Sequence, residues 1–163
     1  MAILNDQSMS KLIRQAFDRD LSEVSAAYCA YMGTEWTFDK SLPVIPQGVQ
    51  KGTLAPIMVY IPDHEPQGIY LLLVNGRLEI KEEPLFIAFE DLKGRKITGF
   101  FFGRTVAFYN HNDEHLRFKL DHSLPEYKGQ KEAQKAILRA VENALPEVII
   151  KRRPKDKGRK GRR

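Results

Sequence analysis

Histidine and cysteine are among the side chains in this sequence that could bind a metal ion or attack a substrate. His111 and His115 are four residues apart, a spacing that lets two histidines on one helix bind the same zinc ion. The pattern around them is instead that of a hydrated turn that leads into a β-strand. Cys29 lies among alanines in a predicted helical segment, where a small core residue is favoured over a reactive thiolate. We therefore predict neither a metal site nor nucleophilic catalysis at these residues.

Two short motifs place carboxylates and a lysine at a spacing that metal-dependent enzymes use. Pro62-Asp63 and Glu79-Ile80-Lys81 resemble the Pro-Asp…Glu-x-Lys motif of a large group of metal-dependent nucleases. The resemblance is limited to these residues, and it implies a divalent ion bound by both carboxylates and a water molecule oriented by the lysine. The predicted strands place Asp63 and Lys81 roughly 10 Å apart. A metal-dependent nuclease is therefore the third of the three functions that we consider.

Other standard catalytic motifs are absent from the sequence. There is no serine in a Gly-x-Ser-x-Gly turn, and residues 93–96, Lys-Gly-Arg-Lys, have the charge of a phosphate-binding loop without its glycine spacing. We therefore predict no cofactor and favour a function that does not involve catalysis.

The strongest charge signal lies in the last thirteen residues. Residues 151–163 contain nine basic side chains and one aspartate, which is +8, so residues 1–150 carry 17 basic and 20 acidic side chains, which is −3. The segment has no apolar side chain, so we expect it to be disordered without a partner. Flexible basic segments bind phosphates with release of counterions and without reading sequence. The nucleic-acid-binding residues predicted here are Lys151, Arg152, Arg153, Lys155, Lys157, Arg159, Lys160, Arg162 and Arg163.

Two predicted strands add basic residues on a solvated sheet face. Residues 77–81 and 115–120 alternate between apolar and polar side chains, which is typical of strands with one packed and one solvated face. In the second strand, Leu116, Phe118 and Leu120 point inward and His115 points outward. The outward basic residues, which we also predict to bind nucleic acid, are Arg77, Lys81, Arg117 and Lys119.

Short apolar segments joined by turns dominate residues 55–120. Asn75-Gly76 and Gly103-Arg104 suit two-residue hairpin turns, and the second turn would pair Thr98 with Tyr109. Residues 91–96 and 110–114 have turn composition. Strands joined by hairpin-length turns indicate an antiparallel meander of about six strands. The predicted fold class is therefore α+β.

Helices are predicted on both sides of this strand region in the sequence. Apolar residues recur at helical spacing over residues 5–31 and again over 130–144, and we expect both helices to pack on one face of the sheet. Residues 34–54 read as an ordered connection with a short edge strand at 42–45, and residues 147–150 as a last short strand. We predict one domain over residues 1–150, followed by the basic tail at 151–163.

The aromatic residues Phe100, Phe101, Phe102, Phe108 and Tyr109 would occupy both faces of one hairpin. One set belongs to the core. The other set is covered by a helix or loop, buried in a dimer, or exposed as a platform on which bases stack. We favour burial.

These observations lead to two principal functions. The first is nucleic-acid binding, in which the body provides shape or partner specificity and the tail provides affinity. The alternative is a protein-interaction module or homodimer that the tail only tethers near DNA or RNA. The single cysteine, the lack of a secretion signal and apolar runs too short for a bilayer favour a cytoplasmic protein without membrane contact. DNA and RNA remain equally open.

Overall fold

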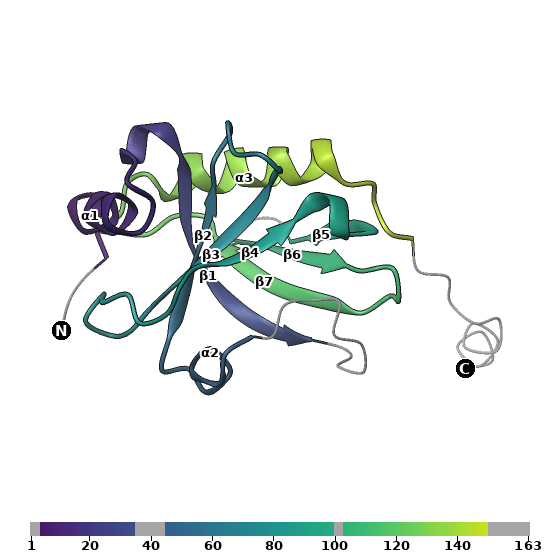
Figure 1. Ribbon diagram of the computed structural model, residues 1–163, viewed down its shortest axis with the longest axis horizontal. Coiled ribbons are helices and arrows are strands. Elements are labelled where there is room, and N and C mark those ends of the chain that lie inside the picture. The colour runs from purple at the N-terminus through teal and green to yellow at the C-terminus, as the bar shows by residue number, and fades with distance from the viewer. Residues whose placement is uncertain (1–3, 35–44, 100–102, 150–163) are drawn as a thin grey trace, which may run out of the picture.

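An antiparallel sheet of seven strands forms the centre of the molecule, and helices pack against it (Figure 1). The computed structural model describes residues 4–34, 45–99 and 103–149. The helices are α1 (Asp6–Phe17), α2 (Gln47–Lys51) and α3 (Gln130–Ala144), with short 3-10 turns at Leu21–Glu23 and Phe89–Asp91. The strands are β1 (Ser25–Thr34), β2 (Ala55–Tyr60), β3 (Gly68–Val74), β4 (Leu85–Ala88), β5 (Gly94–Thr98), β6 (Gly103–Tyr109) and β7 (His115–Asp121).

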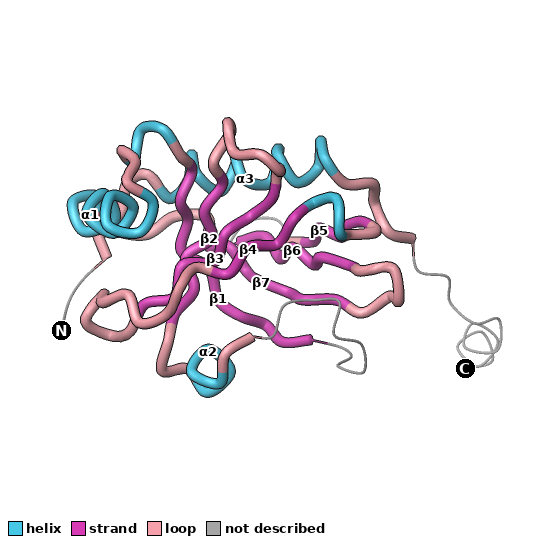
Figure 2. Tube along the Cα trace, viewed as in Figure 1, coloured by secondary structure: helices cyan, strands magenta, loops and turns pink. Residues whose placement is uncertain are grey.

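The strand order is β4-β3-β2-β1-β7-β6-β5. Two antiparallel meanders, β1 to β4 and β5 to β7, are joined side by side because β1 pairs with β7. Figure 2 shows how the strands curve around one another between the helices. The α+β class and the antiparallel sheet predicted from the sequence are confirmed.

The predicted helix over residues 5–31 is wrong beyond its first half. Helix α1 begins at a capping box in which Asn5 Oδ1 accepts from the Ser8 amide at 2.8 Å. It ends where Asp18 takes a left-handed conformation with φ of 55°. The chain then forms β1, which pairs with β2 on one side and β7 on the other. This central strand is apolar on both faces, so its alternation cannot be recognised in the sequence.

Two hairpins also differ from the prediction. Asn75-Gly76 does not form a two-residue turn, because Asn75 Oδ1 accepts from the amides of Arg77 and Glu79 and Leu78 has a φ of 59°. Residues 77–81 therefore form no strand, apart from a bridge between Val74 and Ile80.

The second difference is the register of the β5–β6 hairpin. Thr98 pairs with Thr105 instead of Tyr109, and both Gly103 and Arg104 belong to strand β6. The predicted turn at these two residues is therefore wrong. Phe100, Phe101 and Phe102 lie outside the described residues.

The helices α1 and α3 pack on opposite faces of the sheet, whereas we expected one face. Successive strand residues point to opposite faces. In β2 and β3, Ile57, Val59 and Leu72 pack with α1, while Met58, Leu71 and Leu73 belong to the core cluster of α3. We call these the α1 face and the α3 face. Strands β2 and β3 are apolar on both sides and so need cover on both.

Other elements agree with the sequence more closely. Helix α3 covers the predicted range 130–144, and residues 110–114 form the turn before β7. Leu116, Phe118 and Leu120 are buried as expected. His115 was expected outside but is buried, with its ring against Tyr109.

The predicted last strand, residues 147–150, is represented by one bridge between Glu147 and Arg95. Residues 35–44 of the predicted connection over residues 34–54, which include positions 42–44 of its edge strand, lie outside the described residues. Its described end contains α2, whose Val49 packs into the core of the α3 face.

Candidate nucleic-acid interface

Three basic side chains share the α1 face at the half of the sheet that α1 does not cover. In the register, Lys96 of β5 pairs with Ala107 of β6, which pairs with Arg117 of β7. Lys119, two residues further along β7, pairs with Thr105 and with Ala30 of β1. We call Lys96, Arg117 and Lys119 the basic face. Because Lys96 and Arg117 are two strands apart, their Cα atoms are separated by about 10 Å.

The basic face belongs to the α1 side because Ala30 alternates with Ala26, which packs against α1. The α1 cluster contains residues of β1, β2 and β3 but none of β5, β6 or β7. Within the described part of the chain, the basic face therefore has no helix over it. All three of its cationic side chains are half-buried, so their stems cover sheet surface while their charged ends can reach solvent.

Arg117 is held in place at a bulge of β1. The β1–β7 register shifts between Tyr31 and Gly33, and Arg117 Nη2 donates to the Met32 carbonyl at 3.2 Å. Arg117 Nε is buried and has no hydrogen-bond partner in the described structure. Across residues 4–34, 45–99 and 103–149, no carboxylate forms an ion pair with Lys96, Arg117 or Lys119. No carboxylate among the described residues therefore offsets the positive charge of this face.

Asp121 is the acidic residue of β7 on the same side of the sheet, at the end of the strand beyond Lys119. Burial, and secondly the charge of Asp121, raise the pKa of Tyr28 above its ordinary value. Tyr28 therefore carries no charge at neutral pH. At this end, the basic face is therefore bounded by the carboxylate of Asp121 and the neutral phenol of Tyr28.

The segment after α3 crosses the edge of the sheet and reaches the basic face. Leu145 packs into the core of the α3 face. The Arg95 amide donates to the Pro146 carbonyl at 2.9 Å, and the Val148 amide donates to the Arg95 carbonyl at 2.8 Å. Val148 then packs against Ala107 and Tyr109, on the α1 face. The last described residue, Ile149, therefore lies beside the basic face, and the basic residues 151–163 follow it in the sequence.

The crossing requires a glycine at the start of β5. A Cβ added to Gly94 would lie 2.6 Å from the Pro146 carbonyl oxygen and 2.7 Å from Val148 Cγ2. Real Cβ atoms do not approach other heavy atoms this closely, so any larger residue would push the crossing segment away from β5. Gly94 thus allows the segment that precedes the tail to pack closely on the sheet edge.

The structure separates the four predicted sheet residues into two pairs. Arg117 and Lys119 lie together on β7. Arg77 and Lys81 lie in or just after the turn that follows β3, and β2 and β1 separate that strand from β7. In Figure 1 this turn and the β6–β7 turn lie at opposite sides of the molecule. The nine predicted residues of the tail lie outside the described residues, and their role stays a prediction.

Lys96 belongs to the basic face but was missed by the sequence analysis, which placed it in a turn. The turn composition of residues 91–96 explains this, because it placed Lys96 outside the predicted strands. Residues 94–98 show no alternation of apolar and polar side chains, since Arg95 and Lys96 are both charged, so the local sequence contained no signal for this strand.

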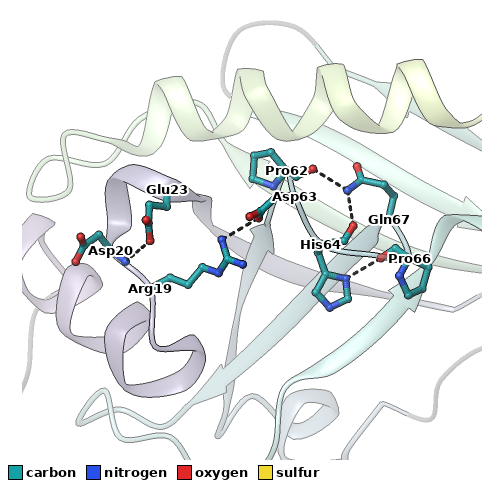
Figure 3. A network of polar contacts seen from close by, with 8 residues as sticks. All are labelled: Arg19, Asp20, Glu23, Pro62, Asp63, His64, Pro66 and Gln67. Carbon is teal, nitrogen blue, oxygen red and sulfur yellow. Dashed lines mark hydrogen bonds and ion pairs between the residues drawn. The ribbon is translucent and has the colours of Figure 1, made fainter.

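The residues of the nuclease-like motif do not meet. Asp63 and Glu79 lie at opposite ends of β3, whose seven residues span roughly 20 Å. Asp63 pairs with Arg19 at 2.8 Å (Figure 3). Asn75, which donates to the Glu79 carboxylate, and secondly Lys81 lower the pKa of Glu79. Each carboxylate thus has its own local partner, and the two cannot bind one metal ion.

The polar contacts of the β2–β3 loop are structural (Figure 3). Gln67 Nε2 donates to the carbonyls of Pro62 and His64 at 2.9 and 2.7 Å. His64 Nδ1 is 2.7 Å from the Pro66 carbonyl and therefore carries the proton, which leaves Nε2 to accept from the Tyr70 hydroxyl at 2.9 Å. Both ring nitrogens of His64 are thus engaged within the loop and its neighbouring strand.

The remaining histidines and the cysteine have ordinary surroundings. His111 is exposed in the turn before β7 while His115 is buried, so they do not share a face. Cys29 is buried in β1, not in a helix, and its Sγ donates to the Pro56 carbonyl at 3.6 Å. Burial raises the pKa of this thiol well above its usual range, so it stays protonated. Among the described residues, no group of three histidine, cysteine, aspartate or glutamate side chains is placed to bind a metal ion.

No protein-family model matches the chain, and no curated protein or solved structure matches it. Function must therefore be inferred from the residues and their arrangement. No helix in the described ranges has the length and apolar composition needed to cross a membrane.

Proposed function

We propose that this protein binds nucleic acid through the basic face together with the basic residues 151–163. The observation that carries the proposal is the crossing of the β5 edge, which brings the chain to the basic face directly before the tail begins. Nine cations of the tail and three of the sheet would then face the same ligand.

The chemistry of this surface favours contacts to phosphates over contacts to bases. The residues between the cations are small, namely Ala30, Thr105 and Ala107, and Tyr109 beside them is 5% exposed. Among the described residues between these cations, no exposed aromatic ring offers a platform on which bases could stack. Lysine and arginine side chains bind the backbone and fix orientation, but they carry little sequence information. The expected binding is therefore strong at low salt and weakly selective.

A pair of matched double variants tests the proposal. Arg117→Glu/Lys119→Glu reverses two charges on the basic face, and Arg77→Glu/Lys81→Glu reverses two in the remote turn. Both change the net charge by the same amount in the full-length protein. We expect the first variant to weaken the binding of a labelled oligonucleotide at low salt by about tenfold or more, and the second by much less. Fluorescence anisotropy measures both affinities, and equal losses in the two variants would contradict the proposal.

A protein partner is the second candidate, and one observation favours it. Met32 and Ile149 are the large apolar side chains that are most exposed in the described structure, at 45% and 82%. Met32 adjoins Arg117, and Ile149 follows the segment that packs on the same face. If the surface binds an acidic protein or a second copy of the chain, Met32→Ser will weaken that association and leave the affinity for an oligonucleotide unchanged. Analytical ultracentrifugation distinguishes the monomer from a dimer.

A further inference from the structure

A cleft of about 340 Å³ lies between α3 and the sheet, away from the basic face. Arg104 of β6 lines it, and Arg104 alternates with Val106 and Phe108, which belong to the core cluster of α3. The cleft therefore lies on the α3 face, opposite the basic face. Its other polar residues are His122, Gln134, Lys135, Arg139 and Glu142.

The spacing of the helix residues aims them at one place. Lys135, Arg139 and Glu142 are at positions i, i+4 and i+7, which lie on one side of a helix. Gln134 fixes this part of α3 against the sheet, because its Nε2 donates to the Leu120 carbonyl at 3.0 Å. The wall that carries the cations is therefore positioned before any ligand enters.

The cleft holds three permanent positive charges and one negative charge. Within the described residues none of the three cations is in an ion pair, with Glu142 or with any other carboxylate. Arg104 Nε is shut off from solvent and has no acceptor in the described structure. A buried guanidinium N–H without an acceptor costs free energy. An oxyanion in the cleft would balance the excess of positive charge on these walls.

We propose that this cleft binds a phosphate group. Guanidinium groups match phosphate oxygens with paired hydrogen bonds, and two arginines and a lysine are more than a single carboxylate ligand needs. The volume is at the lower end of small-molecule sites, which suits a phosphate with one attached group. Two sources share this chemistry: a nucleoside monophosphate, and the terminal phosphate of a nucleic-acid strand. The site does not depend on the function proposed above, because it lies on the other face of the sheet.

Isothermal titration of the full-length protein tests the cleft directly. The ligands are inorganic phosphate, a nucleoside 5′-monophosphate and the same nucleoside without phosphate. The variants are Arg104→Gln and Arg139→Gln, and the control is Lys131→Gln, which removes an exposed cation of α3 that does not line the cleft. Every variant keeps residues 151–163, so phosphate bound by the tail contributes equally to all of them.

We expect the wild type and Lys131→Gln to bind phosphate and the monophosphate but not the nucleoside. Arg104→Gln and Arg139→Gln should each lose about tenfold or more in affinity. Arg139 is exposed on a helix, so its variant remains informative if Arg104→Gln does not fold. Absence of binding to the wild type, or equal affinities of Arg139→Gln and Lys131→Gln, would overturn the proposal.

Two oligonucleotides that differ only in a 5′-phosphate separate the two sources. If Arg139→Gln removes a preference for the phosphorylated strand, the ligand is a strand end. If the wild type has no such preference yet binds the monophosphate more tightly than inorganic phosphate, the ligand is a mononucleotide.

Discussion

Tyr127 shows how one residue of an irregular segment can hold several elements together. Its hydroxyl donates to the Ala26 carbonyl of β1 at 2.6 Å, and its ring packs in the α1 cluster. The neighbouring Lys128 amide donates to Asp6 Oδ1 at 2.7 Å. The segment between β7 and α3 is thus attached both to the start of α1 and to the central strand.

Burial, and secondly the charge of Asp6, raise the pKa of Tyr127 to about 12 from an ordinary value of 10.0. Below pH 10 the phenol is neutral in both the folded and the unfolded state. Between pH 10 and 12 the unfolded chain ionises while the folded protein keeps its proton, so the free energy of unfolding falls as the pH rises. For a shift of this size the loss is on the order of 2 kcal/mol.

Tyr127→Phe isolates this contribution. At pH 9 we expect the variant to be less stable than the wild type by about 0.5–1.5 kcal/mol, because it lacks the hydrogen bond to Ala26. At pH 11.5 the difference should shrink or reverse, since the variant has no phenol to ionise. Urea unfolding at both pH values measures it, and a difference that does not change with pH would show that Tyr127 titrates normally.

At the scale of elements, the sequence predicts the helices and strands that have one packed and one solvated side, because their apolar residues recur at a regular spacing. Helix α3 and strand β7 were predicted nearly in full for this reason. Strand β1 was not, because Ala26, Ala27, Cys29 and Ala30 place small apolar side chains on both faces and fit a helix equally well. The register of β5 and β6 was missed because Gly103-Arg104 looks like a tight turn, whereas both residues pair with β7.

The crossing of the β5 edge is the element on which the proposed function depends, and Gly94 tests it. Gly94→Ala should destabilise the protein by about 1–3 kcal/mol, because the new methyl group collides with Pro146 and Val148. Gly76→Ala is the matched control. Nothing lies within 4 Å of its Cβ position, so its effect should stay within about 0.5 kcal/mol. Chemical denaturation compares the two, and equal stabilities would mean that residues 146–148 do not pack on β5.

At the scale of the whole molecule, the charge is divided between a mildly acidic body and a strongly basic tail. Residues 1–150 carry −3 and residues 151–163 carry +8. Composition alone predicts the tail, and strand alternation predicts Arg117 and Lys119. Lys96 joins these two residues on the basic face, whereas Arg77 and Lys81 do not. This arrangement depends on the strand order and on the direction in which the chain leaves α3. The strand order and the direction of the chain are both set by pairing between strands that are far apart in the sequence. Local sequence patterns do not encode such pairing.

Deletion of residues 151–163, measured as the salt dependence of binding to duplex DNA, tests the central claim most directly. If about five to eight cations neutralise phosphates, the logarithm of the binding constant should fall with the logarithm of the salt concentration. For the intact protein, the slope of this line should be about −5 to −7. The truncated protein keeps the basic face within a body of charge −3, so it should bind far more weakly, with a shallow slope. Its melting temperature should be nearly unchanged, because the deleted segment has no apolar side chain to bury. Truncated and intact proteins that bind equally tightly, or an intact protein that does not bind at low salt, would contradict the account.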